Sequence, residues 1–144
     1  MEGDLFYDGG SFEQVISSNN NVITVNREFI TSRKSVVLYV DMNGHIHYLY
    51  DTKHLSLEIA EPFQAIYNSA QIWKFLSVER LSGVIRNLTP TQIRGTNLEI
   101  IQGYFESLPL DTMQFVPVNT WYNCNTVSDY NTVYSLIKQH EINK

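Results

Sequence analysis

The sequence predicts an α+β fold in which N-terminal antiparallel β-hairpins pack against about four C-terminal helices. Runs rich in β-branched and aromatic residues fill residues 4–51, whereas apolar residues recur at helical spacing over residues 62–142. Strands and helices that are segregated along the chain favour α+β over a parallel α/β sheet, in which they alternate. The chain has 144 residues and no linker divides it, so we expect a single domain over residues 1–144.

The clearest predicted element is a β-hairpin over residues 35–50, in which two β-rich runs flank Asn43-Gly44. Asn-Gly suits a two-residue type I′ turn because both central residues need positive φ. With these residues as the loop, Asp41 pairs with Ile46 and Tyr39 pairs with Tyr48. His45 and His47 then share a face with Leu38, Val40, Met42 and Leu49.

Two further strand regions are predicted before this hairpin. Residues 5–7 and 12–16 flank Asp8-Gly9-Gly10, a turn-forming centre that predicts a second hairpin. Residues 22–25 are β-branched throughout, which predicts a short strand.

Helical spacing predicts four helices in the second half of the chain. They cover residues 62–76 with Pro62 at the first position, 78–88 with Ser77 as N-cap, 89–108 with a Thr89/Gln92 capping box, and 128 to about 140 with Ser128 as N-cap. The last helix carries Tyr130, Val133, Tyr134 and Ile137 as its apolar positions.

Between the third and fourth helices, residues 115–118 predict an edge strand, because Pro117 cannot donate a ladder hydrogen bond. Residues 119–125 read as a polar loop that carries the aromatic pair Trp121-Tyr122.

Composition excludes several classes of partner. Ten Lys and Arg residues stand against fifteen Asp and Glu residues, and the net charge of -5 with no basic cluster argues against nucleic acid. No apolar run approaches the roughly 20 residues of a membrane span. The acidic start of the chain does not resemble a signal peptide, so we expect a cytoplasmic protein, in a host cytoplasm or virion if it is viral.

Two residue types bear on source and cofactors. The lone cysteine, Cys124, cannot form an internal disulfide or build a zinc site by itself, and we expect no cofactor. Thirteen Asn and thirteen Ile against three Ala resemble the output of AT-rich coding, which suggests a virus, a phage or an AT-rich microbe as the source.

The candidate metal ligands are His45 and His47. Two histidines at i and i+2 on a strand point to one face and can present their imidazoles to one ion. A catalytic zinc site needs about three protein ligands, and His54 is the nearest further histidine. The competing interpretation is a pair of partly exposed histidines without a metal.

The candidate partner-binding residues are Trp121 and Tyr122. Tyrosine and tryptophan combine apolar area with a polar tip, and this pair lies in an Asn-rich stretch without periodicity. An equally weighted interpretation is that Trp121 fills the open end of the sheet.

The sequence therefore predicts a non-enzymatic protein–protein interaction or assembly protein that binds a protein partner or itself. A viral or phage structural or accessory subunit is one form of this hypothesis. The alternative is a small metal-dependent or histidine-based hydrolase that uses His45 and His47 with an acid such as Asp41 or Glu58.

Overall fold

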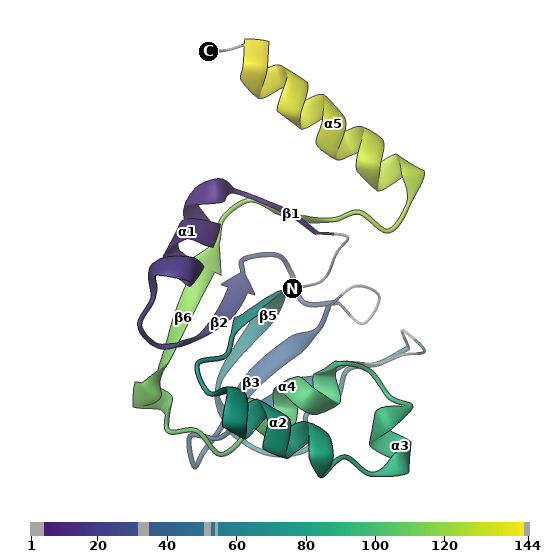
Figure 1. The fold of residues 1–144 in the computed structure, drawn as a ribbon. Coiled ribbons are helices and arrows are strands. Elements are labelled where there is room, and N and C mark those ends of the chain that lie inside the picture. The colour runs from purple at the N-terminus through teal and green to yellow at the C-terminus, as the bar shows by residue number, and fades with distance from the viewer. Residues whose placement is uncertain (1–4, 32–34, 51–52, 54, 143–144) are drawn as a thin grey trace.

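The computed structural model describes residues 5–31, 35–50, 53 and 55–142, and these form a mixed α+β fold (Figure 1). The strands are β1 (Leu5–Tyr7), β2 (Asn21–Asn26), β3 (Val37–Asp41), β4 (Ile46–Leu49), β5 (Phe63–Lys74), β6 (Met113–Val118) and β7 (Trp121–Asn123). The helices are α1 (Gly9–Ser17), α2 (Val78–Arg86), α3 (Pro90–Ile93), α4 (Leu98–Phe105) and α5 (Val127–Ile142), with a 3-10 turn, η1, at Leu110–Thr112. The predicted α+β class is confirmed.

Five strands form the main sheet in the order β4-β3-β5-β2-β6, and β1 pairs with β7 in a separate two-stranded sheet. All neighbours in the main sheet are antiparallel except β2 and β6, which are parallel. The strands predicted over residues 22–25 and 115–118 are both confirmed, and β6 with its Pro117 does lie at an edge of the sheet.

The two faces of the main sheet are covered to different extents. On one face, α4 and α2 cover the sheet (Figure 1). The core there contains Ile23, Leu38, Trp73, Tyr104 and Phe105. On the other face, α1 packs over β2, β6 and the second half of β5. Val15 of α1 meets a smaller cluster there, made of Val22, Ile72 and Val116.

The helix predicted over residues 62–76 is wrong, because this segment is the central strand β5. This central strand carries apolar residues on both faces, and such a run also satisfies helical spacing. The strand is irregular where its register against β2 shifts between Ile23 and Val25, near Gln71 with its positive φ of 60°. The Thr24 hydroxyl donates to the Ile72 carbonyl at 2.8 Å and accepts from the Ile72 N–H at 3.0 Å, which satisfies the backbone there.

The N-terminal hairpin prediction is also wrong, because Asp8 is the N-cap of α1. Its carboxylate accepts hydrogen bonds from the Ser11 N–H at 2.7 Å and from the Ser11 hydroxyl at 2.8 Å. Burial opposes ionisation of this carboxyl group, but these bonds and one from the Thr120 N–H hold its pKa below the usual value. The two glycines after Asp8 thus begin a helix instead of making a turn.

The helix starts are mostly as predicted. Ser77 caps α2, and Thr89 with Gln92 forms the predicted capping box. The helix expected from that box to residue 108 is divided, because α3 ends before Gly95 and α4 begins at Leu98. The last helix is capped by Thr126 and Asp129, each of which accepts the other's backbone N–H, and not by Ser128.

Helix α5 extends away from the rest of the fold (Figure 1). Its main contact is with β7, and Val133 is its buried residue in the described part of the helix, at 5% exposure. The position of α5 leaves most of its length in solvent.

Candidate functional site

The β3–β4 hairpin carries the histidines, and its turn differs from the prediction. The Gly44 N–H donates to the Asp41 carbonyl at 3.1 Å, and the Asp41 N–H donates to the His45 carbonyl at 3.0 Å. The loop therefore has three residues, 42–44, and only Gly44 takes a positive φ, of 84°. The predicted two-residue type I′ turn is wrong; a three-residue loop ending in a left-handed glycine replaces it.

This change shifts the hairpin register by one residue, so each residue of β3 pairs with a different residue of β4 than predicted. Tyr39 pairs with His47, not with Tyr48, and their rings stack with centroids 4.9 Å apart. The predicted face that combined His47 with Leu38 and Val40 is wrong, because those two residues lie in the core under α4.

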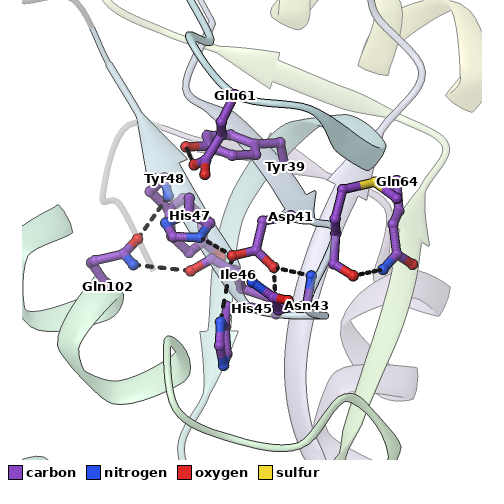
Figure 2. Close-up of polar contacts among 11 residues, drawn as sticks. Tyr39, Asp41, Asn43, His45, Ile46, His47, Tyr48, Glu61, Gln64 and Gln102 are labelled. Carbon is purple, nitrogen blue, oxygen red and sulfur yellow. Dashed lines mark hydrogen bonds and ion pairs between the residues drawn. The ribbon is translucent and has the colours of Figure 1, made fainter.

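The side chain of Asp41 explains the turn (Figure 2). Its Oδ1 accepts the N–H of Asn43 at 2.8 Å and the N–H of His45 at 2.9 Å. Its Oδ2 lies 3.0 Å from His47 Nε2 and 3.4 Å from His45 Nδ1. The hydrogen bond with His47, followed by that from the His45 N–H, holds the pKa of Asp41 well below its usual range, against the opposing effect of burial.

The structure therefore brings His45 and His47 together, with Asp41 between them. Within the described residues, no three His, Cys, Asp or Glu side chains are grouped so as to hold a metal ion. His54, the predicted further ligand, lies outside the described residues, and Glu58 is exposed on a separate segment. Chemically, the cluster is a carboxylate that orients two imidazoles.

His45 is the more accessible of the two histidines, with 55% of its side chain exposed against 30% for His47. It lines an open hollow of about 450 Å³ between the hairpin tip and the segment after α4. The lining comprises Asn43, Gly44 and His45 from the hairpin and residues 107–111 opposite.

A row of exposed and half-buried side chains crosses three strands on the face turned away from α4. Tyr39 pairs with Ile66 on β5 and with His47 on β4, and the Tyr39 ring also lies 6.3 Å from that of Phe63. Phe63 is 42% exposed and Ile66 is 40% exposed. We call Tyr39, His47, Phe63 and Ile66 the open sheet face.

A carboxylate borders the open sheet face. The Tyr39 hydroxyl donates to Glu61 Oε1 at 2.8 Å, as Figure 2 shows. Burial, together with this bond and the negative charge of Glu61, raises the pKa of Tyr39 to about 12. Glu61 thus places an exposed carboxylate beside the open sheet face.

The free edge of β4 is closed by one side chain. Gln102 of α4 accepts the Tyr48 N–H at 2.7 Å and donates to the Ile46 carbonyl at 2.9 Å (Figure 2). Its amide thus replaces a neighbouring strand, which protects an edge that could otherwise pair with another chain.

Helix α5 exposes four large side chains at positions i, i+3, i+7 and i+10. They are Val127 (77% exposed), Tyr130 (59%), Tyr134 (46%) and Ile137 (36%), which we call the α5 stripe. The rings of Tyr130 and Tyr134 stack at 6.1 Å, and Lys138 Nζ lies 4.7 Å from the Tyr134 ring centroid. The sequence identified three of these residues as helical apolar positions but could not show that they stay uncovered.

The predicted aromatic pair lies at the two-stranded sheet. Trp121 is only 7% exposed, and its indole N–H donates to the Ala70 carbonyl at 2.8 Å. Tyr122 is half-buried beside Phe6, with ring centroids 6.3 Å apart. Trp121 is thus part of this chain's own core, and Tyr122 is the partly accessible member of the pair.

No described helix is both long and apolar enough to cross a membrane.

The chain was compared with known proteins and with protein families. No curated protein matches the chain. A family model described as "Domain of unknown function (DUF6564)" matches residues 1–137, and the chain belongs to that family.

Proposed function

We propose that this chain is a non-enzymatic protein-interaction or assembly protein that uses α5 as its docking element. The observation that carries the proposal is the α5 stripe, four large apolar or aromatic residues exposed on one side of a helix that contacts the fold mainly through β7. Contiguous exposed apolar surface of this kind is typical of protein-binding sites.

The spacing of the α5 stripe supports a helix-docking mode. Residues at i, i+3, i+7 and i+10 follow the heptad spacing with which an amphipathic helix enters a groove or meets another apolar face. Two tyrosines at its centre supply large contact area at low conformational cost. The family match extends to residue 137, so it includes all four positions of the α5 stripe.

A contact made through the α5 stripe would also stabilise the helix itself. Most helical stability in proteins comes from packing one face against a partner, and isolated helices of about this length are marginal in water. Helix α5 has 16 residues, and Val133 is its one buried side chain among those described. A partner that covers the stripe supplies the missing packing.

Sedimentation velocity of matched variants tests the proposal. Tyr134→Lys places a charge in the centre of the α5 stripe, and Gln139→Lys places the same charge on the opposite, exposed side of the same helix. We expect the wild type and Gln139→Lys to sediment as the same assembly and Tyr134→Lys to sediment as a smaller species. Identical sedimentation of all three proteins, with the wild type as a monomer, would contradict self-assembly through α5.

The second candidate function is a histidine-based hydrolase, and the contact that favours it is the 3.4 Å approach of His45 Nδ1 to Asp41 Oδ2 beside the hollow. A carboxylate that orients an exposed imidazole is the arrangement of a general base. Hydrolysis of chromogenic esters that is lost in His45→Gln but kept in Tyr134→Lys would favour this candidate. Assembly that is lost in Tyr134→Lys but kept in His45→Gln would favour the first.

A further inference from the structure

We propose that the α5 stripe of one chain packs on the open sheet face of a second copy of the same chain. This inference rests on the proposed function and names the partner. Two apolar surfaces of one chain are left uncovered, one on a helix and one on a sheet, and each is the kind of surface that the other needs.

The open sheet face is covered less completely than its surroundings. The face opposite is covered by α4 and α2, and on the same face α1 covers β2, β6 and the second half of β5. Over β3, β4 and the first half of β5, the sheet instead leaves Phe63 and Ile66 about 40% exposed and Tyr39 and His47 half-buried, while Val37 and Asp41 on the same face of β3 are buried. A sheet normally buries its apolar face against helices or another sheet.

Helix α5 is long enough to cover the open sheet face. A helix of 16 residues is about 24 Å long, whereas β3 has five residues and spans about 17 Å. Two turns of the α5 stripe are therefore enough to cross the exposed parts of β5, β3 and β4, which are neighbours about 5 Å apart.

The two surfaces also have charges of opposite sign beside them. The open sheet face is bordered by the exposed carboxylate of Glu61, whereas the Asp41 carboxylate is buried against His45 and His47. The α5 stripe is bordered by Lys138, whose ammonium lies against the Tyr134 ring. The Lys138 ammonium on the helix and the Glu61 carboxylate beside the sheet favour this contact and disfavour the pairing of two open sheet faces.

The contact between the α5 stripe and the open sheet face forms between two chains and not within one chain. In one chain the four residues of the α5 stripe and the apolar residues Phe63 and Ile66 are all exposed, so α5 does not cover its own sheet face. In a two-fold symmetric dimer, each chain places its α5 on the open sheet face of the other chain, so two helix–sheet contacts are buried. Pairing of two α5 helices buries only one short contact. A stable interface buries roughly 1,000 Å² of surface, and two such contacts come closer to this area than one contact does.

Cross-linking between differently tagged chains tests the inference. One chain carries Ile66→Cys and the other Tyr134→Cys, both with Cys124→Ser, and a short bismaleimide joins cysteines that are close together. We expect the dominant product to contain one chain of each kind, and the same mixture made with Gln139→Cys in place of Tyr134→Cys to give several-fold less product. Because Ile66 is 40% exposed, its substitution is tolerated, and Phe63→Cys provides a second reading of the same face.

The other outcomes separate this inference from the proposed function. Products that contain only Tyr134→Cys chains would show helix–helix pairing, which overturns the inference and keeps assembly through α5. An assembly with no product from Ile66→Cys or Phe63→Cys would overturn the inference in the same way. A monomeric wild type with no cross-link would overturn the inference together with self-assembly through α5.

Discussion

The two faces of the main sheet are built differently. Under α4 the sheet meets Tyr104 and Phe105, both fully buried, and the Tyr104 hydroxyl donates to Asn21 Oδ1 at 2.7 Å. On the other face, α1 covers only the second half of β5, and Phe63 and Ile66 in its first half remain about 40% exposed. The first face holds the fold together, whereas the second leaves apolar area exposed. Under the proposed function, stability and interaction are thus assigned to opposite sides of the same strands.

The largest expected effect comes from the covered face. Phe105→Ala removes a fully buried ring and should lower the free energy of unfolding by about 3–5 kcal/mol. Ile66→Ala on the open sheet face should cost less than about 1 kcal/mol, because much of that side chain is already in water. Urea denaturation at low protein concentration measures both without a contribution from assembly. Equal losses in the two variants would remove the distinction between the faces.

The next effect concerns the aromatic pair of β7. Trp121→Ala should cost about 3 kcal/mol, because it leaves a cavity and an unpaired Ala70 carbonyl. Tyr122→Ala, at the half-buried neighbour, should cost about 1 kcal/mol or less. Thermal unfolding of the two variants checks this order. If Trp121→Ala kept full stability but lost assembly, the indole would belong to the interface and not to the core.

A smaller effect is expected where α4 meets the edge of the sheet. Gln102→Ala removes two hydrogen bonds to β4 and should cost about 1–2 kcal/mol. It also frees the edge of β4 for pairing with another chain, so we expect more aggregation on heating. Light scattering during a thermal ramp measures this, with Gln139→Ala on α5 as the matched control. Unchanged stability and aggregation would show that the edge is protected by something else.

The smallest effect is confined to acid. Because the folded-state pKa of Asp41 is lowered, its ionised form stabilises the fold above the unfolded pKa of about 4, and this stabilisation is lost as the pH falls further. Asp41→Asn should therefore be destabilised at pH 6 but differ progressively less from the wild type below pH 4. Asp111→Asn, at an exposed position in η1, is the charge-matched control. A constant difference across this pH range would contradict the role given to the carboxylate.

Local signals in the sequence predicted much of the fold. The capping box at Thr89 and Gln92, the Ser77 cap and the edge strand with Pro117 each depend on residues that are neighbours along the chain. The existence of the β3–β4 hairpin was predictable for the same reason. Its register was not, because Asp41 stabilises a three-residue loop through its side chain, and the Asn43-Gly44 pair alone favours a shorter turn.

Tertiary context decided the rest. Strand β5 lies in the middle of the sheet, so its apolar residues face both ways and imitate helical spacing. The histidine pair was predictable, but the contact of both rings with one carboxylate depends on the register. Likewise, the residues of α5 indicate an amphipathic helix, but only the fold shows that its apolar side is left uncovered.

The most direct test of the account is hydroxyl-radical footprinting of the wild-type chain over a range of concentrations. We predict that labelling of Tyr130 and Tyr134 on α5 and of Phe63 on the open sheet face falls together as the concentration rises. Ile93, which is 66% exposed on α3, serves as the reference and should not change. Labelling of α5 and Phe63 that stays constant while the protein assembles would contradict the claim that these two surfaces cover each other.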